Sequence, residues 1–157
     1  MFCRGSYNAP YVFVGEAPGE AEDAVGLPFV GPSGRLLEDM ITKAGFPLTQ
    51  VTFVNTIACT PFTSKARNAL RPPTLDEIKA CNPRLQEYLS LFPRKAIVAV
   101  GKEAEKALKL LKLEYHSIVH PAFILRQSDS KAEVMMKRTV LFLQRLRDGI
   151  SEEKACG

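Results

Sequence analysis

The sequence YVFVGEAPGEAED, residues 11–23, joins a short apolar run to an acidic loop and decides the fold class. Its first four residues are aromatic or β-branched and end at Gly15, a pattern typical of a buried strand. A run of this kind followed by a helix-period pattern occurs four times along the chain. This alternation predicts βαβ units, and therefore an α/β protein with a parallel sheet covered by helices.

Outward from this stretch, further strands are expected at 51–54, 96–100 and 117–119. Helices are expected from Ser33 to Gly45, from Thr74 to about Leu91, over 102–111, and from Ala132 to about Arg147. The last helix is expected to bury a stripe made of Val134, Met135, Leu141, Phe142 and Leu146. An irregular loop without acidic residues is expected at 56–73.

Length and composition indicate one globular domain over residues 1–157. Hydrophobic residues make up 46% and charged residues 24% of the chain, which is ordinary for a soluble protein. No apolar run approaches the ~20 residues that span a bilayer. Residues 1–4, MFCR, resemble no secretory signal, so a cytoplasmic protein without a membrane partner is expected.

The charge is polarised along the chain. Residues 1–55 hold three basic and six acidic residues, a net charge of −3, and residues 56–157 hold eighteen basic and eleven acidic, a net charge of +7. A mildly basic protein with an acidic end fits a nucleic-acid partner and an acidic reaction centre. A solvated surface explains the same distribution equally well.

Ligands of parallel α/β sheets bind at the carboxyl ends of the strands. The residues that follow the expected strands are Gly15-Glu16, Asn55, Gly101 and His120. We therefore expect a carboxylate, an amide and an imidazole to converge on one rim. Each has an ordinary structural alternative: the acidic loop as a solvated turn, Asn55 as a turn former, and His120 as a packed core residue.

Phe29 lies among turn residues before a helix, where it could be a core residue or a platform for a stacked base. The loop at 15–23 lacks both GxGxxG and GxxxxGK[ST], and its four carboxylates would repel a phosphate. Such a loop suits the activation of water or the stabilisation of a cation.

Five motifs together resemble the uracil-DNA glycosylase superfamily, and most closely its family 4. They are GEAPGEAED, GLPFVGPSGRLL, VNTIACTPF, RPPTLDEIKACNPRL and HPAFILR, in this order over about residues 11–126. The resemblance implies a three-layer α/β/α sandwich on a four-stranded parallel sheet. It also implies a DNA glycosylase, expected to be a monofunctional monomer, that flips a modified pyrimidine out of DNA and hydrolyses its N-glycosidic bond.

The resemblance implies a role for each matching residue. Glu16, Glu22 or Asp23 would supply the carboxylate that activates water, and the choice among them stays open. His120 would donate to the leaving base. The base would be bound by Gly15, Ala17, Phe29 and Asn55, and DNA by Ser33, Lys65, Arg67, Phe123, Leu125 and Arg126, with 123–125 filling the gap in the duplex.

Family 4 members hold a [4Fe–4S] cluster on four cysteines. Cys59 and Cys81 match two of these ligands, whereas Cys3 alone remains of an N-terminal pair. Cys156 could supply the fourth thiolate. The alternative is a degenerate site with leftover thiols.

The segment between Gly101 and His120 is shorter than family 4 enzymes usually have, which should open one side of the site. Uracil is the default substrate. The alternative is a bulky modified cytosine, such as glucosylated hydroxymethylcytosine in phage DNA, which would make the protein an antiviral defence enzyme. Two other classes are a non-catalytic DNA-binding module and a small-molecule α/β protein, the latter disfavoured by the missing phosphate-loop motif.

Overall fold

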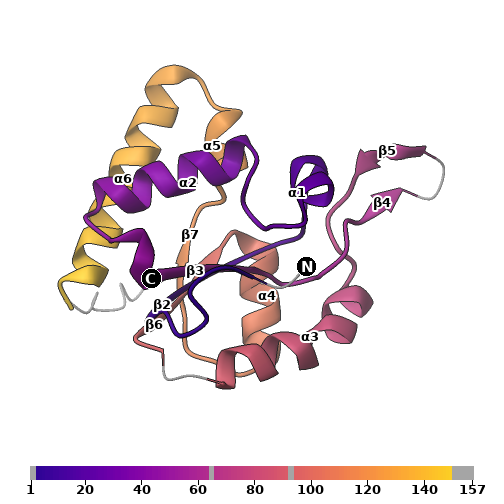
Figure 1. Ribbon diagram of the computed structural model, residues 1–157. Helices are drawn as coiled ribbons and strands as arrows, with labels where there is room; N and C mark the ends of the chain where they lie inside the picture. The colour runs from indigo at the N-terminus through magenta and orange to yellow at the C-terminus, as the bar shows by residue number, and fades with distance from the viewer. Residues whose placement is uncertain (1–2, 64–65, 92–93, 150–157) are drawn as a thin grey trace.

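The computed structural model describes residues 3–63, 66–91 and 94–149 (Figure 1). Within these residues the main sheet has the strand order β1-β3-β2-β6-β7. Four strands run parallel: β2 (Tyr11–Gly15), β3 (Val51–Asn55), β6 (Ala96–Val100) and β7 (His116–Ile118). The predicted four-stranded parallel sheet is therefore confirmed, with β7 beginning one residue earlier than expected.

Helices cover both faces of this sheet. One face carries α2 (Pro32–Lys43), α5 (Pro121–Leu125) and α6 (Asp129–Arg147), and the other carries α3 (Leu75–Ser90) and α4 (Lys102–Leu110) (Figure 1). This arrangement is the three-layer α/β/α sandwich that the resemblance implied.

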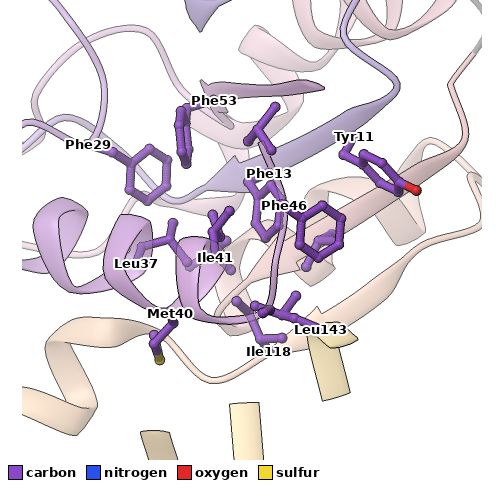
Figure 2. Close-up of a cluster of buried hydrophobic side chains, with 14 of the residues drawn as sticks. Tyr11, Phe13, Phe29, Leu37, Met40, Ile41, Phe46, Phe53, Ile118 and Leu143 are labelled. Carbon is purple, nitrogen blue, oxygen red and sulfur yellow. The ribbon is translucent and has the colours of Figure 1, made fainter. Parts of the chain in front are cut away.

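Each layer of helices packs on its own hydrophobic cluster, because successive strand side chains point to opposite faces. Phe13 of β2 packs with Phe53, Leu37 and Leu143 under α2 and α6 (Figure 2). Its neighbours Val12 and Val14 pack on the other face against α3 and α4. The sheet is thus held between two cores, which fixes the positions of its strand ends.

Helix α3 begins with a capping box made by Thr74 and Glu77. The Glu77 N–H donates to Thr74 Oγ1 at 3.2 Å, and the Thr74 N–H donates to Glu77 Oε2 at 2.8 Å. The reciprocal bonds satisfy two backbone N–H groups that a helix start leaves without intrahelical partners.

Several short elements differ from expectation. An additional edge strand, β1 (Cys3–Gly5), pairs antiparallel with β3. The segment expected to be an irregular loop contains a hairpin of β4 (Phe62–Thr63) and β5 (Ala66–Leu70), and the acidic loop contains α1 (Glu20–Val25). These elements are short and lack apolar periodicity, so the pattern that predicts longer elements is missing from them.

The predicted stripe on the last helix is partly wrong. Val134 and Leu141 are exposed, whereas Leu143 and Thr139 are buried. The helix packs on α2 and α5 along a face rotated from the predicted one, because its apolar residues occur on more than one side. No helix in the described ranges is long and apolar enough to cross a membrane.

Candidate active site at the carboxyl edge of the sheet

A cleft of about 430 Å³ opens at the carboxyl ends of β2 and β3. Its walls come from the loop after β2, the start of α2, the hairpin segment and α5. The lining residues are Glu16, Ala17, Pro18, Gly19, Glu22, Phe29, Ser33, Gly34, Asn55, Pro61, Leu70, Arg71, Pro72, His120, Ala122 and Arg126. The expected rim residues Glu16, Asn55 and His120 therefore do meet in one cavity.

Phe29 and Asn55 line the cleft, and Gly15 lies against both of them. A Cβ atom on Gly15 would lie 2.7 Å from Asn55 Oδ1 and 2.8 Å from Phe29 Cε2. Any side chain at position 15 would therefore displace the amide or the aromatic ring. Phe29 and Asn55 are 7% and 5% exposed, so the small accessible part of each borders the cleft.

The backbone of Phe29 has a φ of 58°, a left-handed conformation that is unusual for a bulky residue. Arg4 holds it there: Arg4 Nε donates to the Pro28 carbonyl at 2.7 Å, and Arg4 Nη2 donates to the Phe29 carbonyl at 2.9 Å. Arg4 also pairs with Glu38 and lies 4.4 Å from the centroid of the Phe53 ring. Arg4 has no sequence signal for this role, because nothing in the sequence links β1 to the loop before α2.

A second arginine, Arg84, bonds the backbone of Asn55. Arg84 Nη2, from α3, donates to the Asn55 carbonyl at 2.8 Å. The next residue, Thr56, donates its N–H and its hydroxyl to the Gly15 carbonyl, each at 2.8 Å. The ends of β2 and β3 are thus tied together, and the Asn55 side chain is held at the floor of the cleft.

The three candidate carboxylates differ in their partners. Both Glu22 oxygens accept backbone N–H groups, from Gly31 at 2.9 Å and Gly19 at 3.2 Å, so Glu22 ties the acidic loop to the start of α2. Asp23 accepts the Thr60 hydroxyl at 2.9 Å and lies outside the cleft lining. Within the described part of the chain, no hydrogen bond engages the Glu16 carboxylate, which lines the cleft.

Burial raises the pKa of Glu16 above its usual 4.5. The nearby Glu103 carboxylate raises this pKa further, and the Lys106 ammonium opposes the rise. The Glu16 carboxylate is therefore less well solvated than an ordinary surface carboxylate, which makes it a stronger base towards a water molecule in the cleft.

His120 is the N-cap residue of α5 and has a defined tautomer. The Ala122 N–H donates to His120 Nδ1 at 3.1 Å, so Nδ1 carries no proton and Nε2 does. Burial, and then the positive charge of Arg126, lowers the pKa of His120 below 6.5. A neutral imidazole with a donor at Nε2 can offer a hydrogen bond to an oxygen in the cleft.

The residues of α5 that are expected to contact DNA lie on two different faces of the helix. Phe123 and Leu125 are 44% and 53% exposed, but Ile124 between them is 1% exposed and belongs to the core. The expectation that the whole of 123–125 fills a duplex gap is therefore wrong for Ile124. Ile124 lies in helix α5 (Pro121–Leu125), whose 3.6-residue period turns it inward.

The other candidate DNA contacts lie around the cleft to different extents. Arg126 and Ser33 line it, Ser33 in the first turn of α2 after the N-cap Gly31. Ala17 lines it and packs against the core under α3 and α4. Arg67 belongs to β5, but its side chain lies outside the described residues, as does the whole of Lys65.

The described cysteines do not form a cluster site. Cys3 lies in β1, Cys81 lies in α3, and Cys59 is exposed. No three His, Cys, Asp or Glu side chains of the described residues come close enough together to hold a metal ion. Cys156 lies outside the described residues. A [4Fe–4S] cluster takes four thiolates, so the three described cysteines do not fit it in this arrangement.

Comparisons with known proteins agree with this geometry. A type-4 uracil-DNA glycosylase from Sulfurisphaera tokodaii is 41% identical over 104 residues, which cover 66% of this chain and 44% of that protein. The Thermotoga maritima type-4 uracil-DNA glycosylase is 30% identical over 155 residues, covering 88% of this chain and 76% of that protein. The chain spans about half the length of the archaeal relatives that it matches.

A solution structure from Methanosarcina acetivorans, described as a candidate uracil DNA glycosylase, has the same fold. Its TM-score is 0.52 at 11% identity, with 92% of this chain and 95% of that chain covered. The family model of the uracil DNA glycosylase superfamily matches residues 2–144. By its sequence and its fold, the chain belongs to the uracil DNA glycosylase superfamily.

Proposed function

We propose that the protein is a DNA glycosylase that flips uracil out of DNA and hydrolyses its N-glycosidic bond, leaving an abasic site. The type-4 uracil-DNA glycosylases among its relatives support uracil as the base. A base stacked in a duplex cannot be reached, so it must be extruded into a cleft. The cavity beside Phe29 and Asn55 would receive it.

The observation that carries this proposal is the tautomer of His120. When the glycosidic bond breaks, negative charge develops on the departing pyrimidine and its carbonyl oxygen. A neutral Nε2–H donor stabilises this charge as it forms, and one such donor is worth about 3 kcal/mol in comparable oxyanion sites. The Ala122 N–H at Nδ1 supports this assignment, because it fixes the proton on Nε2.

Phe29 and Asn55 would recognise the base. The Phe29 ring offers a face on which a pyrimidine stacks, a contact worth about 1–3 kcal/mol per base. The Asn55 amide carries both a donor and an acceptor, which match the alternating groups on the Watson–Crick edge of uracil. Gly15 leaves room for both side chains, and Ala17 continues the wall next to it.

Glu16 would carry out the acid–base chemistry on the sugar side. Its carboxylate lines the cleft, whereas those of Glu22 and Asp23 are engaged in holding the loop. An ionised Glu16 would polarise the attacking water and stabilise the oxocarbenium-like sugar that forms when the bond breaks.

DNA would lie across the mouth of the cleft. The exposed Phe123 and Leu125 would occupy the space left by the flipped nucleotide, as apolar wedges do in kinked DNA. Arg126, the helix start at Ser33, and the basic residues Lys65 and Arg67 would contact phosphates. The described residues of one chain line the cleft, which supports a monomer as the working form, and the proposal is of a cytoplasmic enzyme.

The test is alkali-sensitive strand cleavage of single- and double-stranded DNA that contains uracil, thymine, hydroxymethylcytosine or glucosylated hydroxymethylcytosine. The proposal expects cleavage at uracil, and loss of cleavage in Asn55→Ala and His120→Ala with DNA binding close to that of the wild type. Cleavage confined to the glucosylated base would overturn uracil as the substrate. DNA binding without cleavage of any probe would favour a non-catalytic module.

A further inference from the structure

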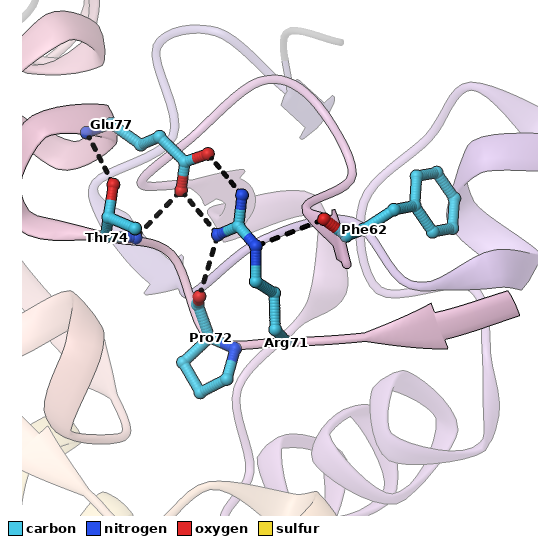
Figure 3. Close-up of polar contacts among 5 residues, drawn as sticks. All are labelled: Phe62, Arg71, Pro72, Thr74 and Glu77. Atoms are coloured by element: carbon cyan, nitrogen blue, oxygen red, sulfur yellow. Dashed lines mark hydrogen bonds and ion pairs between the residues drawn. The ribbon is translucent and has the colours of Figure 1, made fainter. Parts of the chain in front are cut away.

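Arg71 is the most extensively bonded side chain beside the cleft. Its guanidinium donates to both carboxylate oxygens of Glu77, Nη1 to Oε2 at 2.8 Å and Nη2 to Oε1 at 2.7 Å (Figure 3). Its Nε donates to the Phe62 carbonyl at 3.1 Å, and Nη1 also donates to the Pro72 carbonyl at 3.1 Å. A bidentate pair of this kind fixes geometry as well as contributing energy.

These bonds join the hairpin to the start of α3. Phe62 begins β4 of the hairpin, and Glu77 lies in the first turn of α3. The Arg71 side chain, together with the backbone bond from its N–H to the Pro61 carbonyl at 3.2 Å, closes the base of the hairpin. We call the Phe62–Arg71–Glu77 contact the hairpin bracket.

The hairpin bracket adjoins one wall of the cleft. Pro61, Leu70, Arg71 and Pro72 line that wall, and all four lie within one residue of a bracket atom. In the fold, the hairpin projects away from the layers, and α1 is the element drawn next to it (Figure 1). The wall therefore depends on local fastening more than on burial in the main core.

We propose that Arg71 is a positioning residue for base excision: with Glu77 it fastens the hairpin wall of the cleft to the start of α3, and it does not itself contact DNA. The inference rests on the proposed function. A flipped base needs a wall of fixed position, since small displacements in an active site are costly to the rate.

The charges of the two arginines at the cleft support different roles. Arg71 is neutralised by Glu77, and the Arg71 guanidinium and the Thr74 N–H together lower the pKa of Glu77 to about 2, so the pair stays ionised. Arg126 is exposed, and its guanidinium lies 6.0 Å from the Phe123 ring centroid. Arg126 can turn to a phosphate, whereas Arg71 would have to leave a bidentate partner to do so.

The experiment compares Arg71→Ala, Glu77→Gln and the double variant with the wild type. Glu77→Gln keeps an oxygen for the Thr74 N–H but replaces the other oxygen with an amide that cannot accept from Arg71. Lys137→Ala is the matched control, since it breaks the exposed Lys137–Glu133 pair on α6, which lies outside the cleft lining. Single-turnover release of uracil at saturating enzyme and DNA affinity are measured separately.

Both single variants are expected to lower the single-turnover rate by about tenfold, with DNA affinity changed by less than about threefold, because the bracket orders the wall and leaves the phosphate contacts intact. The double variant should be no slower than Arg71→Ala, since the two residues act as one unit. Lys137→Ala should match the wild type. Loss of DNA affinity in Arg71→Ala, with unchanged or tighter binding in Glu77→Gln, would overturn the proposal, because Arg71 would then be a direct DNA contact.

Hydrogen exchange separates this proposal from the proposed function. The amides of 69–71 should exchange faster in both bracket variants and at the wild-type rate in Lys137→Ala. If the wild type released no uracil, the proposed function would fail by itself, and faster exchange would still support the bracket. Unchanged exchange at 69–71 in both bracket variants would overturn the proposal that Arg71 fastens the hairpin wall.

Discussion

Glu16 and His120 lie in one cleft and carry opposite pKa shifts. Burial acts on both, but it disfavours the charged form, which is the deprotonated form of a carboxyl and the protonated form of an imidazole. The pKa of Glu16 therefore rises above 4.5 and that of His120 falls below 6.5. The proposed reaction needs the deprotonated form of each, because Glu16 acts as a carboxylate and His120 as a neutral donor.

The pH dependence of base release follows from these directions. Both groups lose their protons as the pH rises, so the single-turnover rate should rise from the acidic side, with a limiting slope of two on logarithmic axes, and then level off. In Glu16→Gln the remaining activity should rise with a slope of one. A pH–rate series on uracil-containing single strands measures this, and a slope of two that persists in Glu16→Gln would contradict it.

Position 15 requires glycine because neighbouring atoms leave no room for a side chain, and not because of the backbone dihedral angles of Gly15. The Cβ of an alanine would overlap the Phe29 ring and the Asn55 amide. We expect Gly15→Ala to lower the free energy of unfolding by about 1–3 kcal/mol through overpacking. Because the displaced groups are the base-binding ones, uracil release should fall more than stability does. Urea denaturation beside single-turnover kinetics tests this, with Gly26→Ala as a comparison that strains the backbone at φ +82° but meets no neighbouring atom, and so lowers stability without displacing Phe29 or Asn55.

At the scale of elements, α5 combines core and surface in five residues. Ile124 packs into the cluster beneath α2 and α6, while Phe123 and Leu125 face outward. The helix is fixed at its start by the His120 cap and Pro121, so the exposed residues take their direction from the same element that orients the imidazole.

Substitutions on the two faces of α5 should therefore separate folding from DNA distortion. Ile124→Ala should reduce the free energy of unfolding by about 2–5 kcal/mol, as a large-to-small core change. Phe123→Ala should change it by less than about 0.5 kcal/mol. It should slow uracil release from a duplex more than from a single strand, since only a duplex has a gap to fill. Equal slowing on both substrates would argue against the wedge role.

The elements that sequence could predict are those with their own periodic pattern. β2, β3 and β6 are short apolar runs, and α3 carries a capping box, so each has a local signal. β1 and the β4–β5 hairpin have no such signal, because CRG and ARNAL pair through partners distant in the sequence or across a turn. Their strand character comes from tertiary pairing, which overrides weak local preference.

At the scale of the whole molecule, the cleft could be anticipated because topology brings strand ends together. Glu16, Asn55 and His120 follow three different strands and still line one cavity. The arginines that support the backbone around this cavity could not be anticipated in the same way. Arg4, Arg71 and Arg84 act by side-chain bonds to backbone carbonyls, and such bonds leave no spacing in the sequence. The sequence offers Glu22 as a candidate base, yet both its carboxylate oxygens accept backbone N–H groups.

The polarised charge of the chain gives a prediction for DNA binding as a whole. The acidic first third of the chain supplies Glu16 and Glu22 to the cleft lining, and the basic remainder supplies Arg71 and Arg126. DNA attracted to the basic residues releases counterions, and each phosphate contact contributes about 0.9 to the slope of log affinity against log salt on B-DNA.

Removing one phosphate contact should therefore lower this slope by about one. We expect Arg126→Ala to do so and to weaken binding to all sequences alike, because the contact is to the backbone and carries no base information. Lys137→Ala, whose charge is paired with Glu133 on α6, should leave the slope unchanged. Fluorescence anisotropy over a salt series measures both variants. An unchanged slope in Arg126→Ala would place the DNA away from α5, and the wedge role of Phe123 would fall with it.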